Sequence, residues 1–130
     1  MKRYDPARTP HPEEWLALDE QERIALVAAH HRRTRAKLPN RRLHAAIHVV
    51  VENQLAERIA VVRETMEQLL AEGLDRHEAI HAIGSVVAEH LWKAMNERLR
   101  GPDPMEEYFR RLEALTASDW LGGTAPSGSP

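Results

Sequence analysis

His44-Ala45-Ala46-Ile47-His48 and His77-Glu78-Ala79-Ile80-His81 are two five-residue segments that differ at a single position. Together they use four of the chain's eight histidines. Residues four apart on an α-helix lie on the same face, so each segment would present two imidazoles side by side. Two such pairs on packed helices would place four nitrogens around one point. We therefore expect these two segments to decide how the helices pack.

The composition favours a single helical domain. The chain has 130 residues, of which 42% are hydrophobic, 29% charged and only 5% aromatic, and it is rich in good helix formers. There is no cysteine, so any metal must be bound by nitrogen and oxygen. The apolar stretches are too short to span a bilayer, and the first residues lack the apolar core of a secretory signal. We expect a cytoplasmic protein that does not bind membranes.

Helix start and stop signals predict an all-α helical bundle of four main helices plus a short N-terminal helix, with mostly antiparallel neighbours. We expect an extended N-terminal arm over residues 1–12, a single helical domain over 13–121 and a disordered tail over 122–130. The short helix is expected at about 12–16, the four main helices at about 20–36, 41–57, 59–72 and 76–100, and a last helix at about 104–117.

The first histidine pair belongs to a longer stripe. His44, His48 and Glu52 follow each other at intervals of four residues, in a helix otherwise rich in Val, Leu and Ala. Glu52 could be a further metal ligand or a group that orients the histidines. The alternative is a polar seam without metal, in which the imidazoles hydrogen-bond across the helices and to Glu52.

The second pair matches the His-Glu-x-x-His pattern of zinc peptidases, in which two histidines bind zinc and the Glu is the general base. The context differs, because the chain shows no sheet and the motif falls in the first turn of its helix. Glu78 also lies three residues after Asp75, where a capping-box side chain would lie. Gly84 lies about one turn beyond His81. Glycine disfavours helix, and its presence here is explained if another helix packs closely at this position.

The sequence thus predicts a metal site, with zinc or iron as the favoured ion. Four imidazoles would make a closed structural site, whereas three with a water would leave an open catalytic position. An open site would make the protein a metal-dependent hydrolase with Glu78 as base. No substrate-pocket signature supports an enzyme, so we expect a non-enzymatic protein. The predicted ligands are His44, His48, Glu52, His77 and His81.

A basic run offers a different function. It contains six of the chain's 18 basic residues: Arg32, Arg33, Arg35, Lys37, Arg41 and Arg42. Such a run could bind a phosphate backbone or an acidic partner, which would make the protein an interaction module with structural histidines. The run has no interleaved aromatic residues and no helix-turn-helix signature, which argues against nucleic acid. Clustered imidazoles also allow a pH-sensitive scaffold, and Trp120-Leu121 could dock on a second subunit in a homodimer.

Several of these segments form one longer pattern. They are Leu43-His44-Ala45-Ala46-Ile47-His48, Glu52-Asn53-Gln54-Leu55, His77-Glu78-Ala79-Ile80-His81 and Trp92. Over about residues 40–95 this pattern resembles a bacterial family of small helical proteins, domain-of-unknown-function family 1841. The resemblance implies an all-α fold in which the His and Glu positions are the signature, and it implies no activity. Two residues depart from the family pattern: Ile80 replaces an acidic residue, and Asn53 separates Glu52 from Gln54.

Overall fold

The computed structural model describes residues 1, 3–33, 40–96 and 104–122, and the regular structure in these ranges is entirely helical. Its helices are α1 (Pro12–Ala17), α2 (Glu20–Arg33), α3 (Arg41–Ala56), α4 (Ala60–Ala71), α5 (Arg76–Asn96), α6 (Pro104–Ala114) and α7 (Ala117–Leu121). The predicted all-α helical bundle is confirmed. None of these helices combines the length and the apolar character needed to span a membrane.

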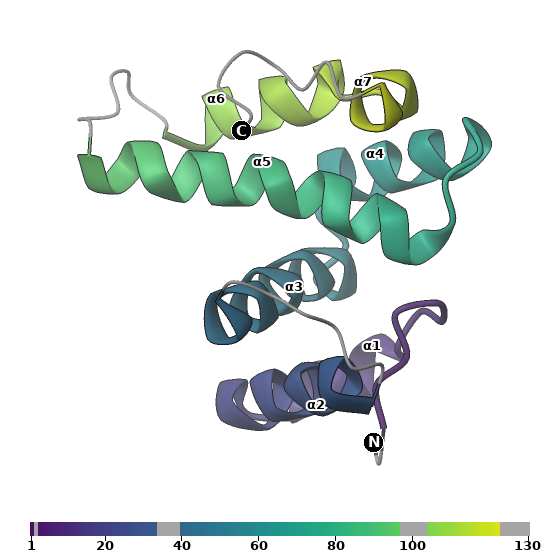
Figure 1. Ribbon diagram of the computed structural model, residues 1–130, viewed down its shortest axis with the longest axis vertical. Coiled ribbons are helices and arrows are strands. Elements are labelled where there is room, and N and C mark those ends of the chain that lie inside the picture. Colours follow the sequence, from purple (N-terminus) through teal and green to yellow (C-terminus); the bar gives the residue numbers. More distant parts are fainter. Residues whose placement is uncertain (2, 34–39, 97–103, 123–130) are drawn as a thin grey trace.

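The helices are stacked with α3 near the middle (Figure 1). Helices α1 and α2 lie at one end, α4 and α5 follow beyond α3, and α6 and α7 lie at the far end (Figure 1). Helix α3 packs against α2 on one side and against α5 on the other. The two helices with paired histidines are therefore direct neighbours, as the sequence predicts.

Side-chain caps fix where the helices begin. Asp19 accepts from the Glu22 N–H at 2.8 Å while Glu22 accepts from the Asp19 N–H at 3.3 Å, which is a complete capping box. Asn40 accepts from the N–H of Leu43 at 3.0 Å and so begins α3. The cap of α5 is Asp75, described with the site below.

The C-terminal helix predicted to run to about residue 117 is wrong, because the chain turns before α7. Thr116 has an extended backbone (φ −128°, ψ 156°), and its side chain accepts the N–H of Asp119 at 3.1 Å. A threonine with this hydrogen bond is a helix N-cap, so it starts a new helix and cannot continue α6. The predicted helix ends at 36 and 100 and nearly all of the predicted tail lie outside the described residues.

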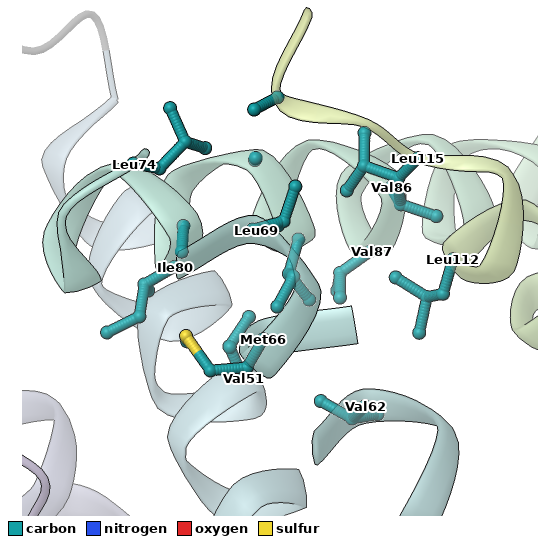
Figure 2. Close-up of a cluster of buried hydrophobic side chains, with 14 of the residues drawn as sticks. Val51, Val62, Met66, Leu69, Leu74, Ile80, Val86, Val87, Leu112 and Leu115 are labelled. Atoms are coloured by element: carbon teal, nitrogen blue, oxygen red, sulfur yellow. The ribbon is translucent and has the colours of Figure 1, made fainter. Parts of the chain in front are cut away.

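The buried side chains form two hydrophobic clusters. The larger one joins α3, α4, α5 and α6, and Figure 2 shows Val51, Met66, Leu69 and Ile80 within it. The smaller one lies between the N-terminal arm, α1, α2 and α3, and it contains Tyr4, Trp15, Val27, Ala45 and Val49. At 100° per residue, the stripe of His44, His48 and Glu52 falls between the α3 residues that enter the two clusters.

Close packing of α3 on α5 depends on a glycine. A Cβ atom built on Gly84 would come within 3.1 Å of Cγ2 of Ile47, which is tighter than ordinary van der Waals contact. Any larger side chain at position 84 would separate the two helices unless Ile47 moved away. The mid-helix glycine therefore has the packing role expected from the sequence.

The N-terminal arm is held firmly against the helices. Residues 3–11 contain no helix or strand, yet Tyr4 is completely buried. Arg33 of α2 donates to the Tyr4 carbonyl oxygen at 3.0 Å, and Arg76 of α5 donates to the Pro6 carbonyl oxygen at 2.9 Å. The arm thus connects α2 with α5 and brings Tyr4 to the interior, which its proline content did not predict.

Candidate metal centre

Four imidazoles from three helices meet in the interior. They belong to His31 of α2, His44 and His48 of α3, and His81 of α5. One ring nitrogen from each lies within 4.8 Å of the corresponding nitrogen of the other three. His31 and His48 are buried, while His44 and His81 are partly buried. The arrangement is a compact set of four nitrogen donors.

The ring positions show how closely the set is packed. Ring centroids lie 4.6 Å apart for His31 and His44, 5.0 Å for His44 and His81, and 5.3 Å for His48 and His81. The interplanar angles of these pairs lie between 72° and 78°, so the rings meet nearly edge to face. Rings at such angles are packed edge to face and are not stacked.

The polar atoms of this cluster are unusual for a protein interior. Within the described part of the chain, the Nε2 atoms of His44, His48, His77 and His81 are buried and have no hydrogen-bond partner. Nearly all buried polar groups in native proteins are paired, and leaving one unpaired costs about 1–3 kcal/mol. Four such atoms in one cluster are a reason to consider it as a binding site.

A hydrogen-bonded chain fixes His48 in the form that can bind a metal. The Tyr4 hydroxyl lies 3.0 Å from Nδ1 of His48 and donates to Oε2 of Glu52 at 2.5 Å. A phenol has one proton, and an ionised carboxylate can only accept. The Tyr4 oxygen must therefore accept a hydrogen bond from Nδ1–H of His48. This tautomer leaves the lone pair on Nε2, facing the other histidines.

Arg76 anchors this chain at its far end. Its two terminal nitrogens donate to Oε1 and Oε2 of Glu52 at 2.7 and 2.8 Å, and the Glu52 side chain is only 1% exposed. A two-point guanidinium–carboxylate pair fixes the carboxylate in both position and charge. Glu52 therefore contacts His48 through Tyr4, and both of its carboxylate oxygens are hydrogen-bonded to Arg76.

The electrostatic surroundings keep the cluster neutral. Burial, reinforced by the neighbouring imidazoles, lowers the pKa of His31 and of His81 to about 4 and that of His48 to about 2. Burial also lowers the pKa of His44, with a further contribution from His77. Because an imidazole must be neutral to donate its lone pair, these residues are ready to bind a metal at neutral pH.

The predicted site and the observed cluster overlap. The structure brings together His44, His48 and His81, with His77 beside them: its ring centroid lies 4.3 Å from that of His81 and 5.4 Å from that of His48. The assignment of these residues as metal ligands stays a prediction. The structure adds His31 to the cluster, whereas the Glu52 carboxylate is hydrogen-bonded to Tyr4 and Arg76.

His31 and Tyr4 were missed from the sequence for different reasons. His31 directly precedes the basic run and was not predicted as a ligand, although it lies four residues after Val27 and so on the same face as that fully buried side chain. This spacing could have identified it. Tyr4 carries no periodic signal, because it lies in a segment without regular structure and its partners are more than forty residues away.

Glu78 has a partner that the sequence did not suggest. Its Oε2 accepts from the indole N–H of Trp120 at 2.6 Å, and this bond fixes α7 against the start of α5. The cap of α5 is Asp75, whose carboxylate accepts from the Glu78 N–H at 2.8 Å. The indole of Trp120, which the sequence suggested as a contact to a second subunit, thus makes a hydrogen bond within the chain.

The basic run is only partly described, since Arg35 and Lys37 lie outside the described residues. Arg32, Arg41 and Arg42 are exposed. Arg33 is also exposed but donates to the backbone of the N-terminal arm. Besides Arg33, the described part of the run therefore contains three exposed arginines near the ends of two packed helices.

These features define a class: a small all-α protein whose helices enclose a cluster of neutral imidazoles. The model of the family described as Domain of unknown function (DUF1841) matches residues 7–114, which is most of the chain. The chain belongs to this family, as its histidine segments suggested. No curated protein and no solved structure matches the chain.

Proposed function

We propose that this protein binds a transition-metal ion through the imidazoles of His31, His44, His48 and His81. The observation that carries the proposal is the convergence of four neutral imidazole nitrogens within 4.8 Å of one another. Three of these residues also contribute a buried Nε2 atom that has no hydrogen-bond partner in the described part of the chain.

The spacing of the nitrogens suits one ion. In a tetrahedral site with metal–nitrogen bonds of about 2.0–2.1 Å, the nitrogens lie about 3.3 Å apart. From separations of at most 4.8 Å, small inward rotations of the rings would complete such a site. Binding would also satisfy the unpaired Nε2 atoms, so the free energy that they cost would become part of the driving force.

The donor set restricts the ion. Four imidazoles without thiolate or carboxylate favour zinc, copper, nickel or iron over magnesium and calcium, which prefer oxygen. Metal-binding histidines commonly donate their other ring N–H to a carboxylate or another acceptor, which fixes the ring. The chain from His48 through Tyr4 to Glu52 fits this arrangement.

A hydrolase with Glu78 as base has less support. A general base must reach the water that it activates, and the Glu78 carboxylate is instead bonded to the Trp120 indole. Four imidazoles would also fill a tetrahedral zinc site and leave no position for water. A closed, non-enzymatic metal site is the function that we propose.

Elemental analysis tests the proposal. Tag-free protein purified without chelator, or reconstituted with zinc or ferrous iron, is expected to contain metal in a stoichiometric molar ratio to protein. The double variant His48→Ala/His81→Ala should contain none, while His90→Ala should retain the metal, because His90 packs against Tyr108 at 5.4 Å between ring centroids. A wild-type protein that stays metal-free after reconstitution would refute the proposal.

A second candidate function uses the exposed Arg32, Arg41 and Arg42 to bind an acidic partner or a phosphate backbone. Their exposure is the observation that favours it. Replacing the three by Glu should abolish binding to a nucleic acid probe, and wild-type binding should fall steeply with salt. Arg33 is best left unchanged in this test, because it holds the N-terminal arm.

A further inference from the structure

Tyr4 brings the N-terminal arm into contact with the proposed metal site. Its hydroxyl oxygen accepts from Nδ1–H of His48 at 3.0 Å. Its ring meets those of His48 and His30 edge to face, with centroids 5.7 and 6.1 Å away. Residues 3–11 contain no helix or strand, so the position of the arm depends on its contacts with the helices.

Hydrogen bonds at two backbone positions hold the arm against α2 and α5. Arg33 donates to the Tyr4 carbonyl oxygen at 3.0 Å, and Arg76 donates to the Pro6 carbonyl oxygen at 2.9 Å. In the interior, the Tyr4 hydroxyl donates to Glu52 at 2.5 Å. A segment without regular structure opens locally at a lower free energy than the core helices do. We therefore expect the arm to detach and dock again while the helices stay folded.

Detachment of the arm would change His48. The Tyr4 hydroxyl lies between Nδ1 of His48 and the Glu52 carboxylate, so its removal would leave Nδ1–H without this acceptor and the ring free to change its tautomer. Loss of such an acceptor from a metal-binding histidine commonly costs about 10–100-fold in metal affinity. The site should therefore bind metal more tightly when the arm is docked.

The same contact acts in the opposite direction. A metal ion on Nε2 withdraws electron density from the His48 ring, which makes Nδ1–H a stronger donor to the Tyr4 oxygen. Two linked equilibria change each other by the same factor. If docking of the arm raises metal affinity about 10–100-fold, metal binding must favour docking by about the same factor.

We propose that metal binding and docking of the N-terminal arm are coupled through the Tyr4 hydroxyl. The arm is then a conformational device that responds to the metal: it is held firmly when the four-imidazole site is loaded, and it detaches more often when the site is empty. This inference rests on the proposed function, because the metal is the ion of that site. The coupling carries the state of an interior site to a segment at the end of the chain.

Hydrogen exchange of the full-length protein tests the coupling. Peptides from the arm are followed by mass spectrometry in chelator-stripped protein and in protein saturated with zinc, and zinc binding is measured in the same samples. Exchange through local opening reports the docking equilibrium of the arm itself. We expect zinc to slow exchange in the arm by about 10–100-fold in the wild type.

Three variants assign the coupling to the hydroxyl. Tyr4→Phe keeps the ring, and zinc should then leave exchange in the arm nearly unchanged. Arg33→Met removes a bond to the arm but keeps the hydroxyl, so exchange should be faster with and without zinc, and zinc should still slow it. Tyr108→Phe is the matched control and should behave like the wild type, because the Tyr108 hydroxyl donates to Gln54.

The outcomes separate this inference from the proposed function. Exchange in the arm that zinc does not change, in a wild type that binds one equivalent, would overturn the coupling and leave the four-imidazole site intact. Equal slowing in the wild type and in Tyr4→Phe would also overturn it, because the hydroxyl would then not carry the effect. A wild type that binds no zinc would refute both proposals.

Discussion

Tyr4 connects the charged groups of the protein to the histidine cluster. It lies between Nδ1 of His48 and Oε2 of Glu52, and it is completely buried. Without it, Glu52 would have no contact with the imidazole, and His48 would be free to change its tautomer. Burial, followed by the charge of Glu52, raises the pKa of Tyr4. The phenol therefore keeps its proton and remains a neutral connection.

Tyr4→Phe isolates this connection. The change leaves Nδ1–H of His48 unsatisfied, so we expect a loss of about 1–3 kcal/mol in stability and a fall of about 10–100-fold in zinc affinity. Chemical denaturation and competitive zinc titration measure the two effects. Tyr108→Phe is the matched control, since Tyr108 is equally buried and donates to Gln54 at 2.6 Å. Equal zinc affinity in wild type and Tyr4→Phe would exclude an orienting role.

The buried ion pair of Glu52 and Arg76 makes a prediction about stability. Arg76→Met leaves a carboxylate with 1% side-chain exposure without its charge partner. Breaking a buried pair from one side costs about 3–5 kcal/mol, measured by urea unfolding. Arg110→Met is the control, because the exposed Arg110–Glu106 pair should contribute about 0.5 kcal/mol or less. Similar losses in both variants would show that burial does not matter here.

At the level of the elements, the sequence predicted most helices because their ends carry local signals. Asp19, Asn40 and Asp75 are caps that can be recognised within four residues, and Gly73 adopts the positive φ of 107° that ends a helix. The break before α7 depends on Thr116, which is a weaker signal. The residues around it favour helix, so the sequence did not predict this break. Local sequence signals therefore predict where most helices begin and end, whereas contacts between residues distant in the sequence leave no such signal.

Gly84 controls the distance between α3 and α5. Gly84→Leu must displace Ile47, so we expect a loss of about 1–3 kcal/mol in stability from overpacking. It should also weaken zinc binding, because the two histidine pairs would move apart. Ser85→Leu is the control one residue along, where the side chain is exposed and the effect should stay within about 0.5 kcal/mol. Thermal unfolding and zinc titration measure both, and unchanged affinity in Gly84→Leu would contradict the argument.

At the scale of the whole molecule, the sequence predicts only those residues of the site that occur as a pair of histidines on one helix. The pairs His44–His48 and His77–His81 follow from helical spacing, and a single helix face reveals them. Helical spacing from Val27 places His31 on the buried face of α2, but no local pattern shows that this face packs on α3. Tyr4 carries no local signal at all, because it reaches the site only through the folding of the N-terminal arm onto α3. The division between Glu52 as orienter and the histidines as donors likewise depends on Arg76, which the fold brings from α5.

The depressed pKa values predict how the stability of the metal-free protein depends on pH. Between the usual histidine value of 6.5 and about 4, the unfolded chain binds protons that folded His31 and His81 do not. Stability should therefore be unaffected by these residues above about pH 7 and should fall as the pH drops through this window. Each such proton contributes a slope of about 1.4 kcal/mol per pH unit. Urea unfolding of chelator-stripped protein measures this slope, and equal stability at pH 7 and pH 5 would contradict it.

X-ray absorption spectroscopy of the protein carrying one equivalent of zinc tests directly whether four imidazoles surround one ion. We expect about four nitrogen neighbours at about 2.0–2.1 Å, with the outer-shell scattering of imidazole rings. In His48→Ala/His81→Ala that signal should be lost. A wild-type spectrum dominated by oxygen neighbours, or one that the double variant reproduces, would show that zinc does not bind at the histidine cluster.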